Sequence, residues 1–303
     1  MFINIPDNYS SLWGELIFEY NSTLDTDIVM SVVDEFSGET IAVKKFYSST
    51  DAKINITPLL FETMLPQPYF LSSGAVAPSV GFPKISVNAG GQSSGELLFT
   101  YARKGVEPPI MLTTMPTSRL LARGESDYIT LIAPSGTTIK YRIEGVGLSA
   151  DSAPLYQNSI TSINGGARQI RIVADEYADE YSSIKVTLLS DDQEFGQVNY
   201  AFSELCGASY RVAWISSQGS IEHYTFPVVE EQVRLSSGAI EKSLRSAYGT
   251  AQEIDALSEI VSSPTVWRAT QEGYTKLELL TTQIATRREG TLTIANVKVV
   301  EYD

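Results

Sequence analysis

The stretch Ile139-Lys140-Tyr141-Arg142-Ile143-Glu144 alternates apolar and charged residues along its whole length. Successive side chains of a β-strand point to opposite faces, so this pattern predicts a strand with one buried face and one solvated face. The same alternation recurs at Ile184–Leu188 and Ile54–Ile56, and short apolar runs bounded by turn residues continue along the chain. Many short strands are typical of sandwiches and barrels. The sequence therefore predicts a mainly β fold of tandem β-sandwich-like domains, immunoglobulin- or fibronectin-like.

Glycine-containing turns separate several of these strands. Asp27–Phe36 and Thr40–Tyr47 flank Ser37-Gly38-Glu39, which predicts a hairpin because glycine readily takes the positive φ of tight turns. The glycine-rich stretch at residues 88–95 lacks the Gly-Lys-Ser/Thr ending of a phosphate loop, and no helical pattern follows it. We interpret it as a hairpin connection. Asn164-Gly165-Gly166 marks a further turn.

Two breaks divide the chain into three segments. The first is Lys104–Pro109, where two prolines cannot donate to a sheet ladder and favour an extended linker. The second is softer and lies at Glu204–Ala208. A chain of 303 residues has room for two or three domains. We therefore predict β-sandwich domains at residues 1–105 and 109–204, and a third β domain at residues 208–303.

One short helix is expected in the third domain, at about residues 250–262. Thr250 and Glu253 form a capping box, in which each side chain satisfies a backbone donor at the start of a helix. An apolar stripe follows, and Pro264 ends the run. The stripe consists of Ile254, Leu257, Ile260 and Val261. We expect the helix to cover an edge or plug an opening of the β domain; a site for a helix-binding partner is the alternative.

The chain is acidic, with 36 Asp and Glu residues against 22 Lys and Arg and a formal net charge of −14. Such a surface repels a phosphate backbone. The basic pairs Lys44-Lys45 and Arg287-Arg288 form no patch, because adjacent strand residues point to opposite faces. No stretch approaches the roughly 18 apolar residues of a membrane span. We predict neither nucleic-acid binding nor a membrane span.

Cysteine and histidine are too few for most catalytic or metal sites. Cys206 is the only cysteine and His223 the only histidine, so no intrachain disulfide forms and a tetrahedral zinc site lacks ligands. A nucleophilic pair would have to use His223, but its strand, Ile221–Phe226, predicts a surface or edge side chain. The sequence therefore predicts no catalytic, cofactor-binding or metal-ligating residues, and no cofactor.

The N-terminal stretch Met1–Asp7 lacks the basic and apolar regions of a signal peptide. Synthesis and folding in a cytoplasm are the expectation.

Carboxylates and aromatic rings offer weaker possibilities. The acidic residues could bind calcium or pair as a glycosidase acid and base, although their order is not that of a calcium loop. They are Asp175, Glu176, Asp179, Glu180, Asp191, Asp192 and Glu194. Their simpler interpretation is a solvated loop. Tyr177, Tyr181, Tyr9 and Trp13 could stack on sugar rings, but most tyrosines in β proteins are half-buried strand residues.

Two stretches resemble proteins of bacterial viruses. Asp34-Glu-Phe-Ser-Gly-Glu-Thr-Ile-Ala-Val-Lys-Lys-Phe-Tyr47, followed by Ile54–Leu59, resembles the first domain of uncharacterised β-rich proteins of Bacteroides-type prophages. Arg211–Pro227 resembles a Trp…Gly…Tyr-Thr-Phe hairpin of tail or virion proteins of phages that infect this group. We expect Trp214 and Phe226 to pack across that hairpin. The resemblance implies a phage tail, baseplate or virion component and supplies no catalytic residues.

These observations together predict a non-enzymatic structural protein that works through protein–protein contacts. The expected partners are other virion or tail proteins, or further copies of the chain in a homo-oligomer. Synthesis would take place in the cytoplasm, and the protein would end in a virion or tail-like particle. A carbohydrate-binding or adhesin-type module, contacting a surface glycan, is the alternative. A carboxylate-based glycan-processing enzyme is the second alternative.

Overall fold

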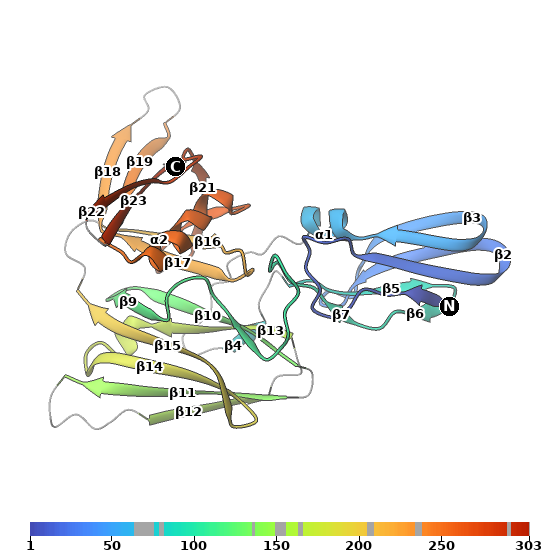
Figure 1. The fold of residues 1–303 in the computed structure, drawn as a ribbon, viewed down its shortest axis with the longest axis horizontal. Coiled ribbons are helices and arrows are strands. Elements are labelled where there is room, and N and C mark those ends of the chain that lie inside the picture. Colours follow the sequence, from blue (N-terminus) through green and yellow to red (C-terminus); the bar gives the residue numbers. More distant parts are fainter. Residues whose placement is uncertain are drawn as a thin grey trace. The chain divides into compact units, whose positions relative to one another are not determined.

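The computed structural model describes residues 1–63, 76–78, 82–134, 137–148, 156–162, 166–204, 209–233, 238–289 and 292–302. The chain is mainly β and forms tandem β-sandwich-like domains, as its alternating sequence predicts (Figure 1). It divides into two compact units. The first comprises Met1–Gln67 and Ser79–Glu107, and the second comprises Pro68–Pro78 and Pro108–Asp303. Within the described ranges, no helix is long and apolar enough to span a membrane.

The first unit is a six-stranded sheet built on one long hairpin. Strands follow the order β1-β2-β5-β6, with β3 paired to β2 and β7 paired to β5. The bounds are β1 (Phe2–Asn4), β2 (Ile17–Asp34), β3 (Thr40–Asn55), β5 (Lys84–Ala89), β6 (Gln92–Ser93) and β7 (Leu97–Leu98). The predicted turn between β2 and β3 is confirmed, and Gly38 there has a φ of 71°.

The β2–β3 hairpin folds back on itself. Its pairing register shifts between Asn21 and Ile28, and Lys44 Nζ donates to the Lys53 carbonyl at 3.3 Å. These two residues are nine apart on one strand, a separation that a straight strand would stretch to roughly 30 Å. The two halves of the hairpin therefore enclose a common core. The core includes Phe18, Tyr20 and Ile54 from one half and Ile28, Met30 and Val32 from the other.

The glycine-rich stretch is a tight hairpin connection, as interpreted from the sequence. Gly90 and Gly91 link β5 to β6 with φ values of 55° and 77°. A Cβ atom on residue 90 would lie 2.1 Å from the Tyr20 hydroxyl oxygen, so a larger residue there would have to displace the Tyr20 side chain. Gly91 faces open space, and its requirement for glycine is conformational only.

A second helix, α1 (Thr57–Thr63), was not predicted. The Asn55 side-chain oxygen accepts from the Thr57 amide at 3.0 Å, and Pro58 suits the first turn of a helix. The preceding Ile54–Ile56 alternation is short and apolar, and it masked this start signal. Thr57 also ties the helix down, since its hydroxyl donates to the Gly14 carbonyl at 2.8 Å.

The second unit begins with a β-sandwich. A four-stranded sheet in the order β4-β13-β10-β8 faces a five-stranded sheet in the order β12-β11-β14-β15-β9. The bounds are β4 (Val76–Pro78), β8 (Ile110–Leu112), β9 (Ser118–Ala122), β10 (Ser126–Ala133), β11 (Thr138–Gly147), β12 (Tyr156–Ser162), β13 (Gly166–Val173), β14 (Tyr181–Ser190) and β15 (Gln193–Ser203), with a 3-10 turn at Ala174–Glu176. The pair β9–β15 is parallel, and every other pair is antiparallel.

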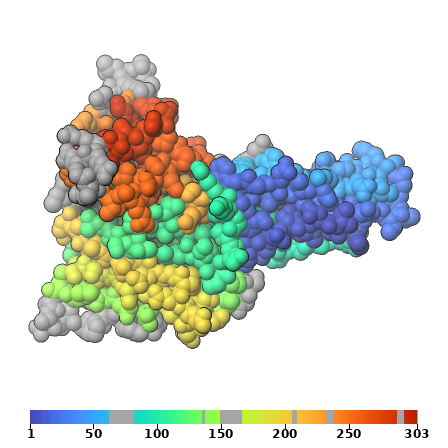
Figure 2. Space-filling model, viewed as in Figure 1, coloured from blue at the N-terminus to red at the C-terminus, as the bar shows by residue number. Residues whose placement is uncertain are grey.

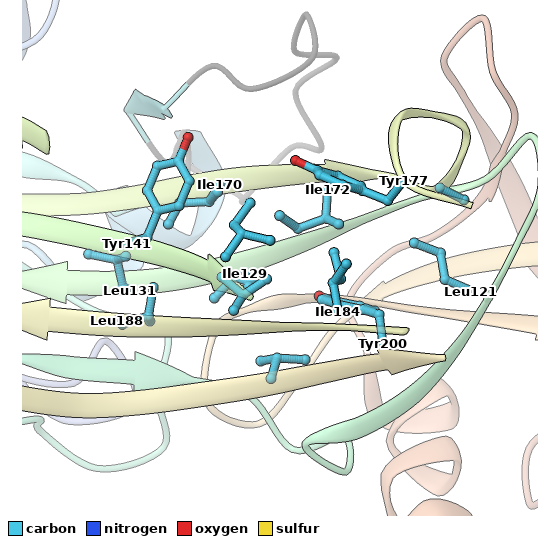
Figure 3. Packing of buried hydrophobic residues seen from close by; sticks show 14 of the residues in the cluster. Leu121, Ile129, Leu131, Tyr141, Ile170, Ile172, Tyr177, Ile184, Leu188 and Tyr200 are labelled. Carbon is cyan, nitrogen blue, oxygen red and sulfur yellow. The ribbon is translucent and has the colours of Figure 1, made fainter. Parts of the chain in front are cut away.

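The core of this sandwich lies between the two sheets. Figure 3 shows Ile129 and Ile170 from one sheet meeting Ile184, Leu188 and Tyr200 from the other. Ile139, Tyr141 and Ile143 are buried while Lys140, Arg142 and Glu144 are not, which confirms the alternation of that stretch.

Strand β4 comes from an unexpected part of the chain. Its residues fall inside the range 1–105 predicted for the first domain, yet β4 pairs with β13 of the sandwich. Pairing between distant segments leaves no signal in local periodicity. The division into three domains at residues 105–109 and 204–208 stays a prediction, and residues 205–208 lie outside the described ranges.

The rest of the second unit is an eight-stranded sheet with a helix packed against it. The order is β17-β16-β20-β21-β23-β19-β18, with β22 paired to β23. The bounds are β16 (Tyr210–Ile215), β17 (Ile221–Phe226), β18 (Val228–Val233), β19 (Ile240–Arg245), α2 (Ala251–Ser258), β20 (Val266–Ala269), β21 (Tyr274–Leu279), β22 (Ala285–Glu289) and β23 (Leu292–Glu301), with a 3-10 turn at Glu259–Ser262. We refer to it as the C-terminal sheet.

The helix predicted at about residues 250–262 is confirmed. The Thr250 hydroxyl accepts from the Glu253 amide at 3.3 Å, and the Glu253 carboxylate accepts from the Thr250 backbone. Ile254, Leu257 and Ile260 are buried in the core of the C-terminal sheet.

The β16–β17 hairpin differs from the sequence prediction in one detail. Trp214 pairs with Glu222, and Phe226 pairs with Tyr210, so Trp214 and Phe226 do not face each other across the strands. Both side chains are fully buried in the same core, at opposite ends of the hairpin. The turn between the strands sets this register, and it is shorter than direct Trp214–Phe226 pairing would require.

Strand β10 is buried on both faces. One face carries Ile129 and Leu131 into the sandwich core, while Tyr128, Thr130 and Ile132 on the other face are also buried. The second face is covered because β10 packs beside β17 of the C-terminal sheet. In Figure 2 the surfaces of the sandwich (green and yellow) and of the C-terminal sheet (orange and red) meet directly. This junction holds most of the buried charge described below.

Candidate functional site

The most concentrated chemistry of the described chain is a group of buried charged side chains at the junction between the sandwich and the C-terminal sheet. We call it the junction cluster. Arg119 comes from β9, Glu125 and Asp127 come from the turn into β10 and its first residues, Arg211 comes from β16, and Glu222 and His223 come from β17. Buried charges are costly unless they are paired, so their arrangement decides whether the junction is stable.

Asp127 lies at the centre of the junction cluster. Arg119 Nη1 donates to its Oδ2 at 2.6 Å, and the Tyr200 hydroxyl donates to the same oxygen at 2.9 Å. Arg211 Nη2 lies 3.6 Å from Oδ1. Burial by itself would raise the pKa of Asp127, but Arg119, His223 and Arg211 outweigh burial and hold that pKa well below its usual range. The side chain is therefore an ionised carboxylate.

Arg119 joins both acidic sides of the cluster. Besides Asp127, it lies 3.4 Å from Glu222 Oε2 and donates from Nε to the Pro116 carbonyl at 3.0 Å. Burial would lower the pKa of Arg119, but the Asp127 and Glu222 carboxylates reverse that effect and raise it. A guanidinium with several fixed acceptors suits a buried site, since its charge is never lost.

Arg211 ties the C-terminal sheet to the β9–β10 turn. Its Nη1 donates to Glu125 Oε2 at 3.1 Å, and its Nη2 donates to the Ser126 carbonyl at 2.8 Å. Glu125 in turn accepts from the Ala122 amide at 3.1 Å and from the Thr225 hydroxyl at 2.6 Å. The turn and the sheet therefore share one set of charge-assisted hydrogen bonds, which are stronger than neutral ones.

Glu222 connects the other end of β17 to the sandwich. Its Oε1 accepts from the Thr114 amide at 3.1 Å and from the Ser220 hydroxyl at 2.6 Å. Burial raises the pKa of Glu222, and Arg119 partly opposes that rise. Glu259 makes a parallel link, accepting from the Thr114 hydroxyl at 2.9 Å.

The prediction that His223 is a surface side chain is wrong. β17 is an edge strand by pairing, as expected, but β10 covers the outer face of the strand. The Tyr128 ring stacks on the imidazole with 5.2 Å between centroids, and 4% of the residue is exposed. Local alternation cannot reveal that another sheet lies over this face.

His223 is held as one neutral tautomer. Burial lowers the pKa of His223, with Asp127 partly opposing the effect. Nδ1 lies 3.5 Å from Asp127 Oδ1, and Nε2 lies 2.9 Å from the Tyr274 hydroxyl. Because Asp127 can only accept, Nδ1 carries the proton and Nε2 accepts from Tyr274.

Asp127, His223 and Tyr274 thus form a row of polar side chains. Burial raises the pKa of Tyr274 well above its ordinary value, so its hydroxyl keeps its proton. Beside this row lies a cavity of about 140 Å³, lined by Tyr128, Arg211 and Arg268 among others. Arg268 is already engaged by Glu301 at 2.5 Å, and Arg211 by Glu125 and Asp127. The charges of this cavity are balanced within the protein.

Four of the seven acidic residues highlighted in the sequence have structural roles. Asp191 and Asp192 form the β14–β15 turn with φ values of 49° and 65°, a conformation that Asp tolerates. Asp175 Oδ1 accepts from the Gly124 amide at 2.8 Å, and Asp179 pairs with Arg123. In the described part of the chain, no three Asp, Glu, His or Cys side chains gather as metal ligands would.

The aromatic candidates for sugar stacking divide sharply. Tyr177 and Tyr181 are buried in the sandwich core and offer no ring face to a ligand. Tyr9 is half-buried. Trp13 is 53% exposed, and its Nε1 donates to the Tyr101 carbonyl at 2.8 Å, which fixes the indole. Cys206 lies outside the described residues.

Comparisons with known proteins identify no family. No family model matches the chain, and no curated protein matches it. Among solved structures, the chain is similar to the crystal structure of Dpr2 Ig1-Ig2 in complex with DIP-Theta Ig1-Ig3, with 9% sequence identity and a TM-score of 0.20. That match covers 100% of this chain and 90% of the other. A likeness at this score supports no inference about function.

Removing the charge of Asp127 should destabilise the second unit strongly. Asp127→Asn leaves Arg119 and Arg211 without their central counter-ion, and breaking a buried pair in this way costs about 3–5 kcal/mol. Urea unfolding, followed by tryptophan fluorescence, measures the change. Asp192→Asn is the matched control, since its pair with Lys140 is exposed and should change stability by less than ~1 kcal/mol. Equal losses from the two variants would contradict the assigned role of Asp127.

The stability of the second unit should depend on pH through His223. The folded-state pKa is lowered, so the unfolded chain takes up the proton first as the pH falls below about 6.5. Stability contributed by neutral His223 is therefore present at higher pH and declines through that window. The groups that face the ring are Asp127, Arg119, Arg211, Tyr128 and Tyr274.

The measurement is the free energy of unfolding of the wild type and of His223→Gln at about pH 7.5 and about pH 5.5. The wild type should lose more stability than the variant over this range, and the opposing effect of Glu222 cancels in the comparison. An identical pH dependence for both proteins would show that His223 is not held neutral.

Proposed function

We propose that this chain is a non-enzymatic structural protein that acts through protein–protein contacts, as a component of a phage or prophage tail, baseplate or virion. The proposed contact surface lies on the first unit. The proposal rests chiefly on where the exposed apolar side chains lie.

Most of the large apolar side chains exposed in the described part of the chain belong to residues 1–47. On the β2–β3 hairpin, Leu24 is 66% exposed, Val43 is 58% exposed and Tyr47 is 71% exposed. Val43 and Tyr47 share one face of β3, since they are four residues apart on the strand. Clustered exposed apolar groups are typical of surfaces that bind other proteins.

Strand β3 also has a free edge. Among the described strands it pairs with β2 only, although it is 16 residues long. Proteins usually protect such an edge, and β3 carries Lys44, Lys45 and Lys53, which discourage uncontrolled pairing. A long, partly apolar edge that carries lysines suits a contact with one specific partner protein.

The second unit contributes rigidity. Two ion pairs of the junction cluster, Arg119–Glu222 and Arg211–Glu125, and the hydrogen bond from the Thr114 amide to Glu222 fasten the C-terminal sheet to the sandwich. A protein that transmits load within a particle benefits from such a junction. The assignment to a phage particle itself is supported by the resemblance of residues 34–47, 54–59 and 211–227 to prophage and virion proteins.

For the carbohydrate-binding alternative, one of the proposed aromatic rings remains available for stacking on a sugar. Of the four aromatic residues considered, only Trp13 is both exposed and held in a fixed orientation. The Arg103 guanidinium lies over the Trp13 ring, with its Cζ atom 5.8 Å from the ring centroid.

Self-association of the full chain should depend on the hairpin surface. We expect the mass of the wild type, measured by light scattering after size exclusion, to rise with concentration. Val43→Lys combined with Tyr47→Lys should weaken this association at least about tenfold, because it buries charge in an apolar contact.

The matched control is Leu148→Lys, which changes an exposed apolar residue of the second unit. It should leave the association unchanged. A chain that stays monomeric at every concentration, or a control that weakens association equally, would count against the proposed contact surface.

A further inference from the structure

A groove runs along β9 in the second unit, separate from the hairpin surface of the first. It is a cavity of about 460 Å³ between β9 and the end of β17, beside the start of α2. Its apolar lining includes Met115, Pro116, Leu120, Tyr224, Pro227 and Tyr248. We call it the β9 groove. In Figure 1, β9 is the strand of the five-stranded sheet that faces β17 and α2.

The backbone of β9 presents free hydrogen-bonding groups to this groove. Among the strands that the structure describes, β9 is the last of its sheet and pairs only with β15, in parallel. The Asn199 amide donates to the Thr117 carbonyl at 2.6 Å, and the Arg123 amide donates to the Ser203 carbonyl at 3.0 Å. Parallel pairing alternates along a strand, so residues 117, 119, 121 and 123 are the ones that face β15.

Residues 118, 120 and 122 therefore face away from β15. Ala122 is satisfied by Glu125, which accepts from its amide and donates to its carbonyl. Ser118 and Leu120 remain, each with an outward amide and an outward carbonyl that bond to no other residue in the described ranges. Two residues in this register can bond an added strand through both of their groups.

The side chains around this edge set what the added strand must carry. Leu120 is 70% exposed and Tyr248 is 53% exposed, and both border the groove. An extended segment places alternate side chains on the two faces of the sheet. Apolar residues at alternate positions would therefore contact Leu120, Met115 and Tyr248.

Charge favours a basic partner. The cations below the groove, Arg119 and Arg211, are buried and neutralised by Asp127 and Glu125. The accessible rim includes Glu204, whose side chain is 72% exposed and pairs with Arg123, and the half-buried Glu253. Arg123 also pairs with Asp179, so these groups together carry a net negative charge. The whole chain has a formal net charge of −14. An acidic rim on an acidic protein attracts lysine and arginine.

We propose that the β9 groove binds one extended segment of a partner protein, added as a strand beside Ser118 and Leu120, with apolar residues at alternate positions and lysine or arginine between them. The backbone supplies the affinity, and the apolar lining and acidic rim supply the selectivity. This site is independent of the hairpin contact proposed above, since neither uses residues of the other.

A random library of displayed dodecapeptides, panned against the immobilised full chain, provides the probe. The enriched sequences should alternate apolar residues with lysine or arginine. The best synthetic peptide is then titrated by fluorescence anisotropy. Leu120→Pro removes the outward amide but no bond to β15, so it should weaken binding at least about tenfold.

Two controls separate edge pairing from damage to the fold. Leu120→Ala keeps the amide and should weaken binding less than Leu120→Pro. A peptide with N-methyl groups at its pairing positions should lose affinity for the unaltered wild type, where folding is not in question. Leu148→Ala, outside the groove, should bind as the wild type does.

Three results would overturn the proposal: no peptide enriched above background, equal binding by Leu120→Pro and wild type, or full affinity of the N-methylated peptide. Concentration-dependent self-association that Leu120→Pro abolishes would also overturn it, because the occupant would then be a second copy of this chain.

Discussion

The second unit depends on one buried, ionised carboxylate, that of Asp127. Asp127 sits among Arg119, Arg211, His223 and Tyr200, and its ionised form is stable only while the cations stay in place. Arg119 and Asp127 belong to the sandwich, and Arg211 belongs to the C-terminal sheet. Separating the two parts would therefore leave charged side chains at the junction without their partners. The charge balance thus fixes the position of one sheet on the other.

The remaining features of the junction follow from that attachment. β10 is buried on both faces because the C-terminal sheet covers its outer side. His223 is neutral because the same contact removes it from water. The first unit follows a different logic: its apolar side chains are exposed on a hairpin with a free edge, which suits contact with other molecules.

The local sequence pattern predicted individual strands, turns and the helix start correctly, but it did not predict which segments pack against one another. The alternation of residues 139–144, the Gly38 turn and the Thr250 capping box each depend on residues close in sequence, and all three are confirmed. The burial of His223 depends on Tyr128, almost 100 residues away, and the β4–β13 pair joins equally distant segments. Long-range packing of this kind leaves no period in a single sequence. The junction cluster was missed for the same reason, since its members come from β9, β10, β16 and β17.

The central claim, that the junction cluster makes the sandwich and the C-terminal sheet one cooperative body, can be tested by hydrogen exchange measured by mass spectrometry. In the wild type, the core amides of β10 and of β16–β17 should exchange through one shared opening with the same free energy. In Asp127→Asn, protection of both segments should fall together. Faster exchange in β16–β17 alone, with β10 unchanged, would contradict the claim and show that the C-terminal sheet opens independently of the sandwich.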